Sequence, residues 1–476
     1  MSVPVISVAQ MREWERVTWA TGQTDAVVIA RVGECLARRA LALTCASDLI
    51  VLLVGKGHNG DDARAMRPHL RERVVTQIDV VEPRAALPEL ERALSESPAL
   101  IVDGLFGIGL TRPLDSDWQR LIAVETRGHV HREHAATRLI HDGENGSPMP
   151  VAMRAAITIT VGAPKQELLA ARAAEFVGRL EVAQDVGLVP CPCESELRWT
   201  LPEDFRGYPP ERPVDGHKGT FGHVAIVAGS LGYHGASVLA SRGAQRACPG
   251  LVSLFTQPDI YMPVAAQLQA VMVHPWKEDL DFSKFTAVLC GPGLAAESLP
   301  ARVPKTARTL WQTSTAPMVV DASALEWLPR ENAPLPGPRV ITPHPGEAAR
   351  SLGCSALDVQ ADRPAALRAL SKQFGNCWVV LKGQHTLIGK AEGDLFINSS
   401  GNSGLAQGGS GDLLAGYIAG WLAQPKLQDD PCGALRFAVF EHGAAADRLS
   451  ERRENWIVEE LADELGRFRT QKNPSF

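Results

Sequence analysis

The sequence lacks any apolar run long enough to cross a membrane. Its 476 residues contain no stretch of about 18 or more apolar residues. The first residues also lack the basic region and the apolar run of a secretory signal. We therefore expect a cytoplasmic protein that is not bound to a membrane.

Cysteine and charge are not concentrated in any part of the chain. The nine cysteines are scattered, which is typical of reduced thiols in a cytoplasm. Cys191 and Cys193 are close together, but no second cysteine pair or histidine cluster stands at the spacing of a zinc site. The formal charge of −6 comes from interspersed acids and bases, which argues against nucleic acid as a partner. This charge is compatible with nucleotide binding, which needs only a few local positive groups.

Length and composition indicate a globular protein of two or three domains. Hydrophobic residues make up 45% of the chain and charged residues 21%. A proline-rich stretch over residues 186–216 has the composition of a linker and predicts a domain boundary near residue 200. Short apolar runs alternate with helical patterns on both sides of it, which predicts two α/β domains with parallel sheets.

In the first half, polar residues follow apolar runs that have the composition of buried strands. The expected strands are residues 50–54, 77–81, 99–103, 157–161 and 180–183. Asn59 follows the first of these strands, and Asp103 ends the third. Ligands of parallel sheets bind at the carboxyl ends of the strands, so both residues are placed where a ligand would bind. Residues 127–153 are polar and histidine-rich, and they show little periodicity.

In the second half, six polar or glycine-rich turns follow expected strands. These turns contain residues 229–236, 291–293, 321, 342–347, 382–386 and 402–412. Their repeated position after strands favours one shared ligand cleft.

The last of these turns, residues 402–412, leads straight into an apolar helical pattern. The start of such a helix presents free N–H groups and a partial positive charge, which suit a phosphate. Asp412 does not suit a phosphate, so we expect it to take a proton from a hydroxyl group beside the phosphate. The alternative is a tight turn in which Asp412 is only an N-cap.

Seven pieces of the second half occur in the order of a known family. They are residues 217–222, 229–236, 291–293, 320–324, 342–347, 382–386 and 402–412. With them, residues 207–472 resemble the ADP- or ATP-dependent NAD(P)H-hydrate dehydratases, which have a ribokinase-like α/β fold. The resemblance implies repair of NADHX and NADPHX, the hydrates formed when water adds to the nicotinamide ring. ADP or ATP with Mg²⁺ would phosphorylate the ring hydroxyl of the (S) form, and phosphate would then leave more easily than hydroxide.

The resemblance also implies roles for single residues. Asp412 would be the catalytic base, and Gly409, Ser410 and Gly411 would present N–H groups to the transferring phosphoryl group. The positions that match contacts to the hydrate are Ala236, Gly293, His344 and Asp412. The positions that match contacts to ADP or its AMP part are Lys382, Gly383, Gln384, His385, Thr386 and Gly411.

Simpler explanations exist for three of these polar residues. His344 stands between two prolines and would only cap a turn. Lys382 would be a solvated surface lysine, and Asp321 would cap the element that follows it.

Residues 1–200 resemble the NAD(P)H-hydrate epimerase domain, a Rossmann-like three-layer fold, in residues 9–12, 55–62 and 103–113. The match is partial, because the family's Asn-Asn-Gly-Gly-Asp-Gly run reads His58-Asn59-Gly60-Asp61-Asp62-Ala63 in this chain. Asp61 would add negative charge where a phosphate approaches. Asn59 and Asp103 match ligands of the family's K⁺ ion. The family's Asp-x-Pro-Ser-Gly motif, which holds the catalytic aspartate, is missing, and Asp142 is its best remnant.

Each domain therefore has an alternative. The first domain is a structural or allosteric remnant, which the loss of motifs favours, or an epimerase of the (R) hydrate with Asp142 as base. The second domain is the dehydratase or a ribokinase-like kinase of a small molecule such as a vitamin precursor. A nucleotide-sensing scaffold is a third reading, against which the intact Asp412 argues. Members of the family often assemble, so a homo-oligomer is compatible with the apolar helices.

Overall fold

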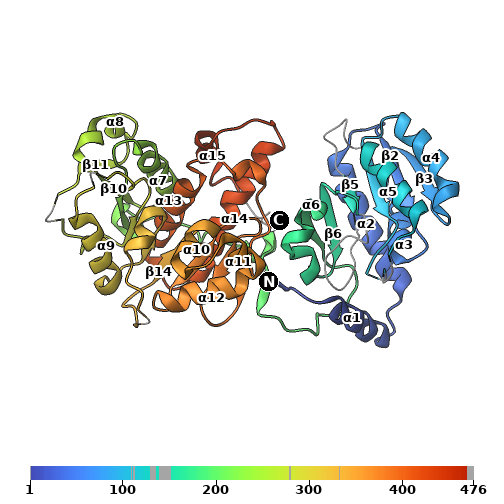
Figure 1. The fold of residues 1–476 in the computed structure, drawn as a ribbon, viewed down its shortest axis with the longest axis horizontal. Coiled ribbons are helices and arrows are strands. Elements are labelled where there is room, and N and C mark those ends of the chain that lie inside the picture. Colours follow the sequence, from blue (N-terminus) through green and yellow to red (C-terminus); the bar gives the residue numbers. More distant parts are fainter. Residues whose placement is uncertain are drawn as a thin grey trace. The chain divides into compact units, whose positions relative to one another are not determined.

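The computed structural model of the protein describes residues 2–108, 110, 113–128, 136–138, 152–277, 280–297, 299–331 and 333–468. The chain divides into two compact units, Val3–Ser195 and Glu196–Phe476, with the first two residues joined to the second unit (Figure 1). Asp142 lies outside the described residues. No helix within the described ranges has the length and apolar character that a membrane span requires.

The N-terminal unit contains one parallel sheet with the strand order β3-β2-β4-β5-β6-β7. Its strands are β2 (Leu49–Val54), β3 (Val74–Asp79), β4 (Leu100–Gly104), β5 (Ala136–Arg138), β6 (Ile157–Val161) and β7 (Arg179–Ala183). Its helices are α1 (Val8–Ala20), α2 (Asp25–Leu43), α3 (His58–Met66), α4 (Pro83–Ser95), α5 (Ser116–Gly128) and α6 (Ala174–Val177). The short strand β1 (Val3–Pro4) begins the chain.

Alternation along β2 explains the layers of this unit. Ile50, Leu52 and Val54 point into a core with α2 and α3, whereas Val51 and Leu53 point into a core with α4 and α5. Successive side chains of a strand face opposite sides of a sheet, so a run that is apolar at every position needs helices on both faces. The three-layer α/β arrangement predicted for this half is confirmed.

The C-terminal unit is built on a larger sheet in which β8-β17-β16-β15-β14-β13-β12-β9-β10-β11 are neighbours in that order. The strands are β8 (Leu197–Trp199), β9 (His223–Val227), β10 (Leu251–Thr256), β11 (Met272–Pro275), β12 (Ala287–Cys290), β13 (Met318–Val320), β14 (Arg339–Ile341), β15 (Trp378–Leu381), β16 (Leu387–Gly389) and β17 (Leu395–Ile397). From β15 to β11 every neighbouring pair is parallel. Strand β16 is antiparallel to both of its neighbours.

Nine α-helices of this unit lie within the described residues. They are α7 (His234–Arg246), α8 (Tyr261–Ala265), α9 (Arg302–Thr313), α10 (Pro345–Leu352), α11 (Ala356–Ala361), α12 (Arg363–Gln373), α13 (Ser410–Leu422), α14 (Pro431–Ser450) and α15 (Val458–Glu464). Helix α13 is buried from Leu413 to Leu422, so the apolar helical pattern predicted after residue 412 is confirmed.

Glycines allow α7 and α13 to pack with their backbones in close contact. A Cβ on Gly416 would lie 1.9 Å from the carbonyl oxygen of Ala240, and a Cβ on Gly243 would lie 2.1 Å from that of Leu413. Only glycine leaves room for such an approach. The packing fixes the start of α13, which follows the turn of residues 402–412, against α7, which follows the turn of residues 229–236.

Candidate active site

The polar turns of the C-terminal unit meet at one edge of its sheet. Gly229 follows β9, Gly291 follows β12, Asp321 follows β13, Thr342 follows β14 and Lys382 follows β15. These strands are parallel neighbours, so their carboxyl ends lie on the same side. The turns therefore share one edge of the sheet, whereas the shared ligand cleft expected from the sequence stays a prediction.

Asp412 lies in the first turn of α13 and does not cap the helix. The N-cap is Gly409, which adopts the left-handed conformation at φ 95°, and no side chain caps this end. The reading of Asp412 as only an N-cap is therefore wrong. Burial raises the pKa of Asp412 to about 7, with a further increase from Asp321 and an opposing effect of Lys382. A carboxyl group with this pKa changes protonation state near neutral pH, as a general base requires.

Lys382 forms a buried ion pair beside Asp412. Its Nζ lies 2.8 Å from Oδ1 of Asp321 and 3.9 Å from Oε2 of Glu347, and its side chain is 18% exposed. Burial by itself would lower the pKa of Lys382, but attraction to Asp321 and Glu347 outweighs it and the pKa is raised. Lys382 is therefore a fixed positive charge, and its reading as a solvated surface lysine is wrong.

Asp321 supports this ion pair and does not cap the following element. It stands at the N-cap position of the 3₁₀ helix Ala322–Trp327, yet its side chain makes no capping hydrogen bond. Instead, Oδ1 of Asp321 accepts hydrogen bonds from the hydroxyl of Thr342 at 2.7 Å and from Nζ of Lys382 at 2.8 Å. Its residue is only 2% exposed, and a buried carboxylate needs such partners.

His344 and Glu347 form a capping box at the start of α10. Nδ1 of His344 accepts a hydrogen bond from the N–H of Gly346 at 3.0 Å, and Oε2 of Glu347 accepts one from the N–H of His344 at 2.8 Å. The capped turn that was considered for His344 is thus present. It fixes the imidazole so that Nε2 lies 3.6 Å from Oε1 of Glu347, with half of the His344 side chain exposed.

Ala236 and Gly293, both predicted to contact the hydrate, are neighbours. Gly293 has φ 65°, and a Cβ on it would lie 2.8 Å from Cβ of Ala236 and 2.5 Å from the carbonyl oxygen of Tyr233. The hydroxyl of Ser230 donates a hydrogen bond of 2.6 Å to the carbonyl of Gly293. The turns after β9 and β12 are therefore tied together beside the start of α7.

Arg363 of α12 contacts the backbone at the start of the loop 382–386. This guanidinium donates to the carbonyl oxygens of Leu381 at 3.0 Å and of Lys382 at 3.4 Å, and burial lowers its pKa to about 10. A Cβ on Gly383, at φ 133°, would lie 2.7 Å from Nη1 of Arg363.

Further along this loop the side chains differ in exposure. Gln384 is exposed. His385 packs its ring edge-on against Trp199 at 5.0 Å, and burial lowers its pKa to about 4. The hydroxyl of Thr386 donates to the carbonyl of Gly383 at 3.1 Å.

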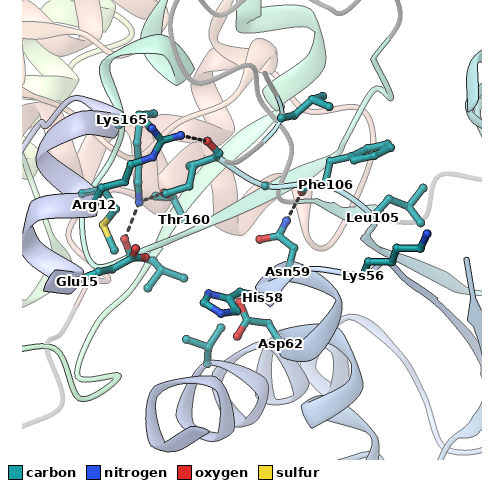
Figure 2. Close-up of a pocket in the computed structure, with 18 of the residues that line it drawn as sticks. Arg12, Glu15, Lys56, His58, Asn59, Asp62, Leu105, Phe106, Thr160 and Lys165 are labelled. Atoms are coloured by element: carbon teal, nitrogen blue, oxygen red, sulfur yellow. Dashed lines mark hydrogen bonds between the residues drawn. The ribbon is translucent and has the colours of Figure 1, made fainter. Parts of the chain in front are cut away.

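The N-terminal unit contains a cavity of about 920 Å³ at the carboxyl ends of its strands (Figure 2). His58, Asn59 and Asp62, from the first turns of α3, line it. Figure 2 shows them opposite Lys165 and Thr160, with Asn59 donating to the carbonyl of Phe106. Gly60 packs against the backbone of Gly55, since a Cβ on Gly60 would be 2.1 Å from the carbonyl oxygen of Gly55.

Two groups in this cavity have strongly shifted pKa values. Burial, followed by repulsion from Asp61 and Glu15, raises the pKa of Asp62 to about 7. Burial lowers the pKa of Lys165 to about 8, against the attraction of Glu15 and Glu167. Nζ of Lys165 donates to Thr160 at 3.0 Å and to the carbonyl of Val161 at 2.7 Å. Such pairs of shifted groups in a cavity are typical of functional sites.

Asp61 and Asp103 do not join the residues that line this cavity. The carboxylate of Asp61 forms an exposed ion pair of 2.6 Å with Arg64, so its side chain does not line the cavity. Asp103 is buried, and its Oδ1 accepts a hydrogen bond of 2.9 Å from the N–H of Leu105. Asn59 and Asp103 offer two of the oxygen donors expected for K⁺, whose site in this unit stays a prediction.

Comparisons with known proteins cover both units. The family model described as NAD(P)H-hydrate dehydratase matches residues 224–467, and the model described as YjeF-related protein N-terminus matches residues 75–167. A bifunctional NAD(P)H-hydrate repair enzyme of Gloeobacter violaceus is 32% identical, over 94% of each chain. The ADP-dependent (S)-NAD(P)H-hydrate dehydratase of Neisseria meningitidis is 38% identical over 50% of this chain and 81% of its own.

The chain belongs to the bifunctional NAD(P)H-hydrate repair enzymes. A solved structure agrees with this family. The ADP/ATP-dependent NAD(P)H-hydrate dehydratase of Bacillus subtilis, co-crystallized with ATP/Mg²⁺, is 31% identical, with a TM-score of 0.50 over 56% of this chain and 94% of that one. The family resemblance drawn from the sequence motifs is thereby confirmed.

Two residues of this repair enzyme were not singled out as site residues from the sequence. Lys165 follows β6 by four residues, and Asp321, read only as a cap, follows β13 directly. Both stand after the carboxyl end of a parallel strand, which is the signal that identified Asn59 and His344. The sequence around Lys165 and Asp321 does not show that either side chain is buried, because the residues that cover them come from distant segments of the chain.

Proposed function

We propose that the C-terminal unit carries out the ADP-dependent dehydration of the (S) form of NADHX and NADPHX to NADH and NADPH. The ion pair of Lys382 with Asp321, whose charges act on Asp412 in the first turn of α13, is the observation that carries this proposal. The names of the relatives supply the substrate class. Asp412 is the base, and Ala236, Gly293 and His344 contact the hydrate. The loop of Lys382, Gly383, Gln384, His385 and Thr386 holds the nucleotide.

The reaction needs a base beside a phosphate site. The ring hydroxyl gives its proton to Asp412 while its oxygen bonds to the β-phosphorus of ADP, and the bond from that phosphorus to AMP breaks. The ring C–O bond then breaks and inorganic phosphate leaves. A proton leaves the neighbouring ring carbon, which restores the double bond of the dihydropyridine ring. Gly409, Ser410 and Gly411 present backbone N–H groups to the charge that develops on the phosphoryl group.

The Mg²⁺ that accompanies such nucleotides usually keeps several waters and takes few protein ligands. In the described part of the chain, no group of three His, Cys, Asp or Glu side chains is arranged to hold a metal ion. The phosphates of the nucleotide would hold the Mg²⁺, whose charge would neutralise part of theirs. The proton passes directly from the ring hydroxyl of the substrate to the carboxylate of Asp412.

One assay tests the dehydratase. The protein is mixed with hydrated NADH, Mg²⁺ and ADP, and the absorbance of the reduced nicotinamide is followed. We expect recovery of the (S) form, loss of that recovery in Asp412→Asn, and release of AMP. A stable phosphorylated product would instead indicate the small-molecule kinase, which the relatives do not favour. No recovery in the wild type refutes the proposed function.

The cavity of the N-terminal unit favours a second activity, epimerisation of the (R) hydrate. Asp62 and Lys165 titrate near pH 7 and 8 in a space large enough for a ring substrate. This observation weighs against the purely structural remnant that the loss of motifs favoured. In this candidate Lys165 and Asp62 exchange protons with the hydrate, whether or not Asp142 takes part.

The full-length protein with ADP separates these two alternatives. An active epimerase consumes the (R) hydrate faster than its spontaneous epimerisation, and Lys165→Met abolishes this acceleration while conversion of the (S) form continues. If the wild type leaves the (R) hydrate at its spontaneous rate, the N-terminal unit is a remnant. Asp142→Ala, tested in the same way, shows whether that residue is needed.

A further inference from the structure

Lys382 is the first residue of the loop 382–386, but its side chain points away from the other residues of this loop and toward Asp321 and Glu347. The backbone N–H of Lys382 donates to Pro343 at 2.9 Å, and its carbonyl faces Arg363. The side chain turns toward the neighbouring strand ends, where Nζ meets Asp321 after β13 and Glu347 in α10. The ammonium group is thus held by carboxylates from two other elements, the turn after β13 and the first turn of α10.

The same ammonium group lies against the first turn of α13. A Cβ on Gly411 would be 3.2 Å from Nζ of Lys382, and the charge of Lys382 acts on Asp412. Gly411 therefore leaves space for this ammonium group at the start of α13, where free N–H groups suit an anion. A phosphoryl group seated on this turn contacts Nζ.

We propose that Lys382 is a catalytic residue which holds the transferring phosphoryl group, and that it does not read the AMP part of the nucleotide. This inference rests on the proposed dehydratase function. Nζ keeps its proton throughout and donates hydrogen bonds to the phosphoryl oxygens. It does so as the P–O bond to AMP breaks, as the bond to the ring oxygen forms, and again as inorganic phosphate leaves.

The partners of Lys382 explain why its ammonium group points toward the first turn of α13. Asp321 accepts from Nζ while the hydroxyl of Thr342 holds the same oxygen of Asp321. Asp321 is therefore a positioning residue, since it acts on the phosphoryl group through Lys382. A lysine without these partners would populate many rotamers, and fixing it in one of them on the phosphoryl group would cost conformational entropy.

Calorimetric titration with AMP and with ADP tests the inference apart from catalysis. In Lys382→Met we expect the affinity for AMP to stay within about twofold, while the affinity for ADP falls about tenfold, since a charge-assisted hydrogen bond to the outer phosphate is lost. Equal losses for AMP and ADP, or no loss for either, overturn the inference. Lys372→Met, an exposed lysine of α12, is the matched control and should bind both nucleotides as the wild type does.

Kinetics give the second measurement. We expect kcat of Lys382→Met to fall at least 100-fold at saturating ADP, and Lys382→Arg to recover part of it because the charge is kept. We expect Thr342→Val to lower kcat about tenfold with unchanged AMP affinity. A Lys382→Met variant with wild-type kcat and a raised KM for ADP contradicts the inference. If the wild type itself fails to convert the hydrate, the proposed function fails, whereas the AMP and ADP titrations still decide the contact of Lys382.

Discussion

Gly416 of α13 lies so close to Ala240 of α7 that a Cβ on Gly416 would be 1.9 Å from the carbonyl oxygen of Ala240. The two helices begin at the two turns that form the candidate active site, at His234 and Ser410. The separation between these turns is therefore set by a backbone contact that tolerates no side chain.

We expect Gly416→Ala to lower the free energy of unfolding of the C-terminal unit by roughly 2 kcal/mol, as overpacking of a core does. The nearest atoms belong to backbone, which has little freedom to move aside. Thermal unfolding followed by circular dichroism measures the change. Gly408→Ala is the control, since its Cβ would meet nothing within 4 Å and should change stability by less than about 0.5 kcal/mol. Equal stabilities of the two variants would show that the helices separate easily.

The raised pKa of Asp412 predicts how the dehydratase depends on pH. A base must be deprotonated to act, so with a pKa of about 7 we expect kcat to rise with pH up to neutrality and to level off above it. Asp321→Asn removes a negative charge that raises this pKa, and the midpoint should move to lower pH by roughly half a unit or more. The kcat profile from pH 5 to 9 measures both effects.

Two outcomes would contradict this assignment. One is a kcat that does not change between pH 5 and 9 in the wild type. The other is a midpoint that stays in place in Asp321→Asn, because Asp321 would then not act on the titrating group. Glu326→Gln is the matched control, since this exposed carboxylate pairs with Arg350 on the surface and should leave the profile unchanged.

Arg363 predicts an effect on the nucleotide and not on the chemistry. Its guanidinium donates hydrogen bonds to the carbonyl oxygens of Leu381 and Lys382. Arg363→Met removes these bonds and should make the backbone of residues 383–386 less well ordered. We expect the KM for ADP to rise about tenfold with kcat changed less than threefold. Arg368→Met removes a guanidinium of the same helix that holds Ala391 and Gly393 instead. If both variants raise the KM equally, the effect comes from α12 as a whole.

The sequence predicted the strands and the turns that follow them better than the contacts of the site. Strand β6 has the expected bounds of 157–161, because all five of its residues are β-branched and a glycine follows them. Strand β3 begins three residues before the expected 77. Its start was missed because Val74 is exposed and follows charged residues, so no apolar run marks it. Strand β5 lies inside the stretch of little periodicity, where no apolar pattern marked it.

The site residues divide in the same way. Glycine and proline mark the turns of Asp412 and His344 locally, and the family resemblance added the role of His344. The ion pair of Lys382 with Asp321 was not found, because 61 residues separate the two side chains and only the pairing of β13, β14 and β15 brings them together. Motif loss around Asp61 suggested a damaged anion site, yet the side chain turns to Arg64, a choice of rotamer that no spacing reveals.

Lys165 predicts a stability that depends on pH in the N-terminal unit. Its pKa is lowered from 10.5 to about 8 by burial. Between these values the unfolded chain holds a proton that the folded chain does not, so folding becomes more favourable as pH rises through this window. The gain is at most about 3.5 kcal/mol, since the pKa falls from 10.5 to about 8 and one pKa unit corresponds to about 1.4 kcal/mol.

Urea unfolding of the wild type and of Lys165→Met at pH 7.5, 9 and 10.5 measures this gain. We expect the wild type to gain stability relative to Lys165→Met from pH 8 upward, whereas the difference stays constant below pH 8 because Lys165 is then charged in both states. Lys56→Met is the control, since this lysine lines the same cavity but is 65% exposed. Its difference from the wild type should not change in the window. A constant difference for Lys165→Met as well would mean that the buried ammonium group keeps its ordinary pKa, and almost none of Lys165 would then be in the neutral form that can accept a proton from the hydrate.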